Sequence, residues 1–260
     1  MKLKKFVYLK LVTFSIVSLF LACSTSDDSY QNTSAPFNEL LNNNGSNSGS
    51  SDNNPNTNNQ NLKLLSLGDS YTIGQSVCET CRFPEQLKDS LRAQLSSDIN
   101  FELKVIAKTG WTTSNLINAI KTENLFYNYD LVTLLIGVNN QYQGQAFSLY
   151  ETEFPDLVNT AILLAKGDKT NVIVVSIPDY AYTPYGSGNE YISKDIDKYN
   201  EFAQAYCAIN NISFVNITDI TRQGLENPDL VASDGLHPSS LAYSFFVERI
   251  LPIALDKLIY

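Results

Sequence analysis

Short apolar runs recur along the chain from residue 62 onward, and segments with a helical spacing of apolar residues separate them. The runs do not alternate between polar and apolar positions, as strands with one solvated face do. Continuous apolar runs of six or seven residues are typical of strands buried on both faces, as in a parallel sheet. Five such strands are predicted, over residues 62–67, 101–107, 131–136, 171–177 and 212–217.

The segments between these runs are predicted helices. Pro84 suits the first turn of a helix, and leucines follow four residues apart at Leu87, Leu91 and Leu95. Alternating strands and helices predict an α/β fold, a three-layer α/β/α sandwich with a central five-stranded parallel sheet. Residues 62–260 have the length of one domain with a substantial core. The other predicted helices cover residues 113–123, 155–166, 193–210 and 239–258.

Residues 1–22 are predicted to be an export signal. Four lysines among the first ten residues precede an uncharged stretch, residues 11–22, which is too short for a membrane span but fits a signal-peptide core. Cys23 follows at once, and this arrangement resembles a bacterial lipoprotein signal, with Phe20 where leucine is preferred. The resemblance implies lipidation of Cys23, which would become the new N-terminus. The alternative is plain secretion with a chance cysteine.

Residues 23–61 are rich in Asn, Ser, Thr and Gly and offer almost nothing to bury. They are predicted to form a disordered tether, which as a flexible coil would separate the domain from a membrane by about 35 Å. The Ser-Asp-Asp run in this segment resembles the surface-export signals of some Gram-negative lipoproteins. The expected location is therefore outside the cytoplasm, anchored by lipid to the bacterial outer membrane, and both a periplasmic and an outward-facing position stay open.

The charge of the chain is strongly acidic. It has 18 basic and 27 acidic residues, and removal of the four signal lysines leaves 14 basic residues and a net charge of −13. Such a charge opposes binding to nucleic acid and to anionic lipid surfaces. A nucleic-acid partner is therefore not expected.

Three cysteines remain once Cys23 is assigned to the lipid. Cys78 and Cys81 are the obvious local pair for a disulfide outside the cytoplasm, and free thiols are the main alternative. A zinc site needs about four ligands. One histidine and a distant Cys207 supply too few, so no metal is expected.

Polar and glycine residues follow the predicted strands where each strand ends. Ser70 comes after the first, Gly110 after the second and Asn139 after the third, and Asp234 and His237 come after the fifth. In open α/β sheets the ligand site lies beyond the carboxyl ends of the strands. Independent segments therefore converge on one edge. His237 is the only histidine in the chain, and histidine is the residue type best suited to proton transfer near neutral pH.

These segments resemble the motif blocks of the SGNH (GDSL-type) hydrolase family. The commoner leucine after the serine is Tyr71 here, and Asn140 stands where the family often has aspartate. The blocks occur in the family's order over about residues 62 to 255, and they imply the flavodoxin-like fold of SGNH hydrolases. They comprise residues 68–74, Gly110, residues 137–140 and residues 234–238.

The resemblance implies a role for each matching residue. Ser70 would be the nucleophile and His237 its general base, while Asp234 would orient the imidazole and stabilise its positive charge. The oxyanion hole would consist of the backbone N–H groups of Ser70 and Gly110 and the side chain of Asn139. Asp69, beside the nucleophile, is expected to brace its loop.

Two aromatic features bear on specificity. Trp111 follows the oxyanion glycine and could form a wall of the acyl or alcohol subsite. Residues 178–186 include Tyr180, Tyr182 and Tyr185, and this loop either faces the substrate, where tyrosines can stack on sugar rings, or is a packed surface loop.

The predicted function is a serine esterase that hydrolyses carboxylic esters through an acyl-serine intermediate, without metal or organic cofactor. O-acetylated carbohydrates, short-chain esters and lysophospholipids all stay open as substrates, and the sequence does not define the oligomeric state. The alternative is a non-catalytic, glycan-binding surface lipoprotein on the same fold. A complete set of Ser70, Asn139, Asp234 and His237 favours the enzyme, because a binding protein has no need of a base.

Overall fold

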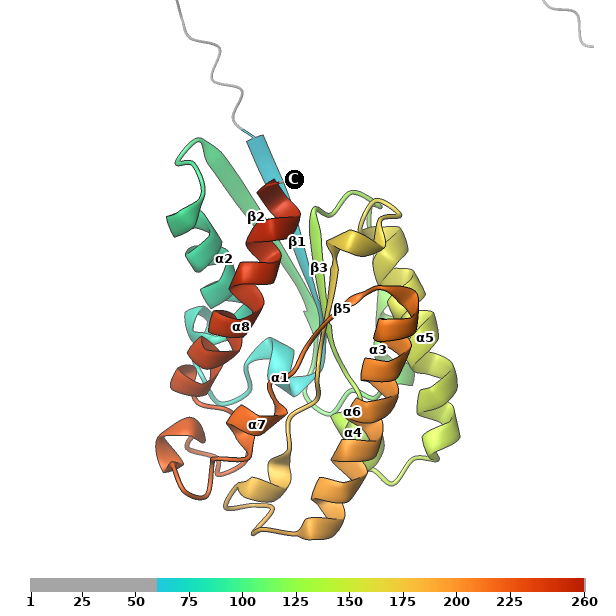
Figure 1. Ribbon diagram of the computed structural model, residues 1–260, viewed down its shortest axis with the longest axis vertical. Helices are drawn as coiled ribbons and strands as arrows, with labels where there is room; N and C mark the ends of the chain where they lie inside the picture. The colour runs from blue at the N-terminus through green and yellow to red at the C-terminus, as the bar shows by residue number, and fades with distance from the viewer. Residues whose placement is uncertain (1–59, 260) are drawn as a thin grey trace, which may run out of the picture. The chain divides into compact units, whose positions relative to one another are not determined.

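The structure of the chain is a computed structural model, which describes residues 60–259. Five strands form one sheet in the order β2-β1-β3-β4-β5, and every neighbouring pair is parallel (Figure 1). The predicted α/β fold with a five-stranded parallel sheet is confirmed. The strands are β1 (Gln60–Gly68), β2 (Ile99–Ala107), β3 (Leu131–Leu135), β4 (Val172–Val175) and β5 (Ser213–Val215).

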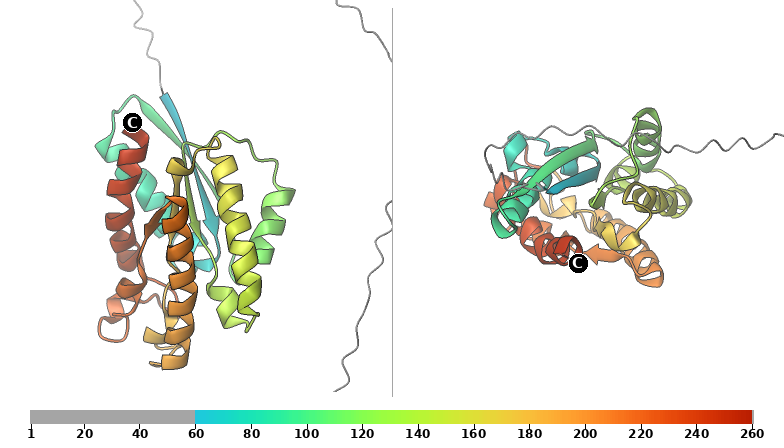
Figure 2. Two further views of the ribbon diagram at one scale, coloured as in Figure 1. Left: turned by 45° about the vertical axis from the view of Figure 1, so that its right-hand side comes forward. Right: turned by 90° about the horizontal axis from the view of Figure 1, so that it is seen from above.

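Helices cover both faces of the sheet. On one face α2 (Phe83–Gln94) packs against α8 (Ser240–Ile259), and on the other lie α3 (Thr113–Thr122), α5 (Phe147–Leu164) and α6 (Glu190–Asn210), as Figures 1 and 2 show. Three helices of four or five residues lie in loops that follow strands β1, β3 and β5. These are α1 (Ser70–Ile73), α4 (Val138–Tyr142) and α7 (Thr218–Thr221). None of the helices in residues 60–259 is long and apolar enough to span a bilayer.

The core lies between the sheet and the two helical layers. All residues of β3 and β4 are buried, as expected for central strands covered on both faces. Between α5 and α6 an aromatic cluster fills the layer, with ring centroids 4.6 Å apart for Tyr150 and Tyr199 and 6.2 Å apart for Phe154 and Phe202. Such separations suit tilted and edge-to-face packing. The rigid core fixes the strand ends from which the polar loops emerge.

Several predicted boundaries differ from the structure by a few residues, and two of the differences bear on the fold. Gln60 and Asn61 belong to β1 rather than to the tether, because they pair with the first residues of β2 and Asn61 bonds to Glu102. Helix α5 begins at Phe147, and Pro155 lies in its interior instead of at its start. Proline removes one helical hydrogen bond, but the buried aromatic residues of the first turns outweigh that cost. The predicted signal peptide, the lipidation site Cys23 and the tether up to residue 59 lie outside the described residues.

Cys78 and Cys81 form a disulfide, whereas Cys207 is a free thiol buried in the core. Burial raises the pKa of the Cys207 thiol to about 12. No group of three or more His, Cys, Asp or Glu side chains that could hold a metal ion occurs within residues 60–259.

Candidate active site

Ser70 is the first residue of α1, directly after the end of β1. The tight strand-to-helix turn depends on Gly68, where a Cβ atom would lie 2.1 Å from Thr72 Oγ1 and 2.4 Å from the carbonyl oxygen of Leu135. Asp69 caps the helix by accepting a hydrogen bond from the Tyr71 backbone N–H (3.0 Å). The serine therefore stands at the carboxyl edge of the sheet, at the start of a short helix.

Asp69 lies beneath this turn and is completely buried. Its Oδ2 is 3.4 Å from Asn139 Nδ2, so it links the serine turn to the segment after β3. Burial raises the pKa of Asp69 to about 7, against the lowering effect of its hydrogen bonds from Tyr71 and Asn139. The hydrogen bonds of Asp69 with Tyr71 and Asn139 are those expected of a residue that braces the serine loop.

Gly110 occupies a turn after β2 that the Trp111 N–H closes onto the Lys108 carbonyl (3.2 Å). Its φ of +83° lies in the left-handed region, which glycine adopts without the penalty that a side chain brings. A Cβ atom there would meet nothing within 4 Å, so the need for glycine is conformational rather than steric. Gln143 Nε2 donates to the Gly110 carbonyl (2.9 Å) and holds the turn against α4.

Asn139 comes from α4, after β3, and lies between the two turns. Its Nδ2 donates to the Trp111 carbonyl at 3.1 Å, and its contact with Asp69 is longer. The neighbouring Asn140 is fully buried, accepts from the Thr113 backbone N–H (3.0 Å) and donates to Thr113 Oγ1 (2.6 Å). The amide at position 140 thus ties α4 to the start of α3, a contact that the sequence did not define.

Asp234 and His237 share the loop that precedes α8. One carboxylate oxygen of Asp234 accepts from the backbone N–H groups of Leu236 and His237, each at 3.0 Å. The other lies 2.6 Å from His237 Nδ1 and accepts from Ser76 Oγ, also at 2.6 Å. Partial burial opposes ionisation, but the hydrogen bonds from Ser76 and His237 hold the pKa of Asp234 well below its usual range. The acid is therefore ionised and bonded to the imidazole.

The structure brings Ser70, Gly110, Asn139 and His237 together as lining residues of one cavity with a volume of about 160 Å³. Asp234 supports this set from behind the imidazole, whose ring lies 5.2 Å, centroid to centroid, from that of Tyr71. A hydroxyl, a carboxylate-bonded imidazole and candidate N–H donors thus meet around one small space. This arrangement has the parts needed for nucleophilic attack on a carbonyl group. The other lining residues are Tyr71, Thr109, Val138, Tyr142, Tyr180 and Leu236.

The suggestion that Trp111 forms a wall of the site is wrong. In the part of the chain that the structure describes, Trp111 does not line this cavity, and its side chain packs against the core. Its backbone carbonyl, however, contacts Asn139.

Sequence reasoning missed Tyr142, which lies with Tyr185 at the rim of the cavity. The two hydroxyl oxygens are 2.7 Å apart, and the side chains are about half exposed, at 52% and 54%. Tyr180, from the aromatic loop singled out in the sequence, lines the cavity and donates to Gln141 Oε1 (2.8 Å). No sequence signal points to Tyr142, because α4 has only five residues and shows no periodic pattern.

The comparison with known proteins bears out the resemblance noted in the sequence. The GDSL-like lipase/acylhydrolase family matches residues 66–245. Among curated proteins, none matches the sequence.

Several solved structures share the fold at low sequence identity. The acetylxylan esterase Axe2 from Geobacillus stearothermophilus is 20% identical, with a TM-score of 0.58 over 74% of this chain and 94% of that chain. The lipase/acylhydrolase from Enterococcus faecalis is 19% identical, with a TM-score of 0.58 over 75% and 96%. LAE5, an α/β hydrolase from the metagenome of Lake Arreo, Spain, is 18% identical, with a TM-score of 0.60 over 78% and 98%. The chain therefore belongs to the GDSL-like lipase/acylhydrolase family and is an ester-hydrolysing enzyme.

Proposed function

We propose that the protein is a serine esterase in which Ser70 is the nucleophile, His237 the general base and Asp234 the residue that orients the imidazole. The main support is that Ser70 and His237 line one cavity while His237 Nδ1 lies 2.6 Å from the Asp234 carboxylate. A carboxylate on Nδ1 fixes the tautomer that leaves Nε2 free to accept a proton. The serine hydroxyl needs such a base, because it is a weak nucleophile on its own.

The reaction would proceed in two halves. Ser70 Oγ attacks the carbonyl carbon of the ester as its proton passes to His237 Nε2. The tetrahedral intermediate then collapses, and the leaving alcohol takes that proton and departs, leaving an acyl-serine. Water next attacks the acyl carbon and gives a proton to His237. Collapse of the second intermediate releases the carboxylic acid and returns the proton to Ser70.

The negative charge on the attacked carbonyl oxygen would be stabilised by three donors. They are the backbone N–H groups of Ser70 and Gly110 and the side-chain amide of Asn139, all from residues that line the cavity. Asn139 has two N–H bonds, and its contact with the Trp111 carbonyl uses one of them. The longer contact, with Asp69 at 3.4 Å, is the one that an oxyanion would have to replace.

The cavity favours a small acyl group. Its volume of about 160 Å³ is below the roughly 300–1,000 Å³ of ordinary ligand pockets, which argues against a long acyl chain. The alcohol part of the substrate must leave past the rim, where Tyr142 and Tyr185 offer aromatic faces and hydroxyl groups without a formal charge. This surface suits a neutral, hydroxylated ring, and the similar fold of an acetylxylan esterase points the same way. We therefore favour O-acetylated carbohydrates and other short-chain esters as substrates.

A panel of p-nitrophenyl esters of graded acyl length, together with acetylated sugars and lysophospholipids, tests this proposal. We expect kcat/KM to fall by about tenfold or more once the acyl chain exceeds about four carbons, because the extra methylenes find no room. The Ser70→Ala variant gives the background rate. Preference for long chains would overturn the short-acyl assignment, and rates equal to that of Ser70→Ala with every ester would overturn the serine-esterase assignment.

The competing function is a non-catalytic glycan-binding protein on the same fold. The observation in its favour is the pair Tyr142 and Tyr185 at the rim, which could bind a sugar without any ester hydrolysis. Membership of an ester-hydrolysing family and the Asp234–His237 hydrogen bond both favour the enzyme. A glycan that binds while no ester is turned over would favour the binding protein.

We also propose an extracytoplasmic location, with the esterase anchored to the outer membrane through lipid on Cys23. An acidic domain on a long polar tether suits contact with neutral polymers outside the cell. The Cys23→Ser variant is expected to move from the membrane fraction to the soluble fraction, because the anchor would be lost. Continued sedimentation of this variant with membranes would contradict lipid anchoring at Cys23.

A further inference from the structure

The segment that follows α1 touches three separate parts of the candidate active site. The backbone N–H groups of Gly74 and Gln75 donate to the carbonyl of Ser70, at 3.1 and 3.0 Å. Gln75 Oε1 accepts from Thr109 Oγ1 (2.5 Å), next to the Gly110 turn. Ser76 Oγ donates to Asp234 (2.6 Å). Two consecutive side chains thus connect the serine turn with the oxyanion turn and with the acid.

Ser76 makes its contact from an unusual backbone conformation. Its φ is +67°, in the left-handed region that residues other than glycine rarely adopt. Such conformations persist where the surrounding structure requires them, and they gather at functional sites. In this conformation the serine side chain reaches across to a loop 158 residues further along the chain.

The hydrogen bond from Ser76 acts on the Asp234 oxygen that contacts the histidine. Ser76 donates to Oδ2, the same oxygen that bonds His237 Nδ1, whereas the backbone of the loop holds Oδ1. About 30% of the Asp234 side chain is exposed, so water competes for this oxygen. The Ser76 hydroxyl at 2.6 Å limits that competition and holds this oxygen beside the imidazole.

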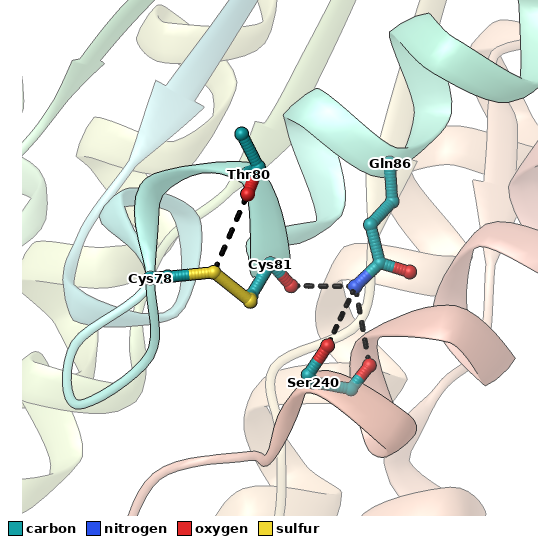
Figure 3. The surroundings of a disulfide bond; sticks show 5 residues. All are labelled: Cys78, Thr80, Cys81, Gln86 and Ser240. Carbon is teal, nitrogen blue, oxygen red and sulfur yellow. Dashed lines mark hydrogen bonds between the residues drawn. A yellow bond between two sulfur atoms is a disulfide. The ribbon is translucent and has the colours of Figure 1, made fainter.

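Two residues after Ser76 in the sequence, Cys78 forms a disulfide with Cys81 (Figure 3). The Cys78–Cys81 bond ends the loop, and Gln86 Nε2 donates to the Cys81 carbonyl (2.5 Å) and to the Ser240 carbonyl (3.1 Å). Ser240 opens α8, three residues after His237. Gln86 of α2 therefore connects the end of the loop that carries Ser76 to the start of α8, the helix that follows His237.

We propose that Ser76 is a positioning residue of the catalytic triad, which holds the Asp234 carboxylate in the orientation that His237 needs. The inference rests on the proposed function, because it assigns Ser76 a role only if Asp234 and His237 carry out the chemistry. Ser76 is not among the residues that line the cavity, and its side chain bonds to Asp234 rather than to Ser70 or His237.

Ser76→Gly is the most informative variant, since glycine removes the hydroxyl and relieves the positive φ. We expect kcat with p-nitrophenyl acetate to fall about tenfold, as for a lost hydrogen bond to a charged group, with KM within about twofold of wild type. The melting temperature should stay equal or rise, because the backbone strain is removed. Ser76→Ala should show the same loss of kcat with a lower melting temperature. Asn211→Gly is the matched control, since Asn211 also has a positive φ (+55°) but ends α6 at the opposite edge of the sheet.

The single histidine offers a second measurement that a purely structural role would not change. In protein labelled with ¹⁵N, the Nδ1–H proton of His237 is expected far downfield, because its acceptor is only 2.6 Å away. In Ser76→Gly we expect this resonance to move upfield or to broaden through exchange with water. Wild-type kcat and an unchanged resonance in Ser76→Gly would overturn the positioning role, while activity that still depends on Ser70 would leave the esterase assignment intact. Wild-type protein no more active than Ser70→Ala would instead overturn the proposed function itself.

Discussion

Replacing His237 with alanine is expected to lower kcat for ester hydrolysis by about 10⁴- to 10⁶-fold. His237 is the only histidine in the chain, so no other imidazole can take the proton from Ser70. Its ring lines the cavity with Ser70 and is held by the carboxylate of Asp234. Steady-state hydrolysis of p-nitrophenyl acetate measures the loss. In the His237→Ala variant, a water molecule in the space left by the imidazole would be the remaining proton acceptor, and it would determine the residual rate.

A folding defect must be separated from a chemical one in this variant. His237 is buried, and its backbone carbonyl accepts from the Ala232 N–H (2.7 Å), a bond that alanine retains. His237→Gln keeps a polar side chain of similar reach but cannot shuttle a proton, and it should lose as much activity with a smaller change in melting temperature. A rate within tenfold of wild type in either variant would show that the imidazole is not the base.

Replacing Asn139 with alanine is expected to lower kcat by about 10²- to 10³-fold, with little change in KM. The reason is that the amide would donate to an oxygen that carries full negative charge only in the transition state. The bound ester carries no full charge on its carbonyl oxygen and does not need this donor, so the affinity of the enzyme for the ester should be nearly unchanged. Steady-state kinetics with a short-chain ester separates the two parameters.

Asn139→Asp is the matched comparison, because it keeps the size of the side chain and replaces the N–H donor with a carboxylate oxygen. It should lose at least as much activity as the alanine variant. The new carboxylate would also lie beside that of Asp69, because Asp69 Oδ2 is 3.4 Å from Asn139 Nδ2 in the wild-type protein. If Asn139→Ala kept its rate within about threefold of wild type, the oxyanion hole would have to consist of backbone donors alone.

The order of strands and helices could be predicted because each element is marked by a run of apolar residues within its own segment of the sequence. Every predicted strand has a counterpart in the sheet, since the central strands are covered on both faces and show continuous apolar runs. Parallel strands present their carboxyl ends at one edge, and this rule predicts from the sequence that Ser70, Gly110, Asn139 and His237 lie together. The structure places them around one cavity.

The short helices and side-chain contacts of the site had no comparable signal. Helices α1 and α4 have four and five residues, too few for any periodic pattern of apolar positions. Trp111 follows the oxyanion glycine in the sequence, but its partly buried side chain packs against the core and does not line the cavity. The bond from Ser76 to Asp234 joins loops 158 residues apart, and neither residue type reveals its partner. Such contacts depend on the folded geometry of two loops at once.

The acyl-serine mechanism predicts one reactive hydroxyl in a chain that contains many. Treatment of the purified protein with a fluorophosphonate probe, followed by peptide mass spectrometry, should find a single adduct on Ser70. The adduct should be absent from Ser70→Ala and form far more slowly in His237→Ala, because the probe requires a serine activated by its base. An adduct on a different residue, or ester hydrolysis at the wild-type rate without any adduct on Ser70, would contradict the mechanism.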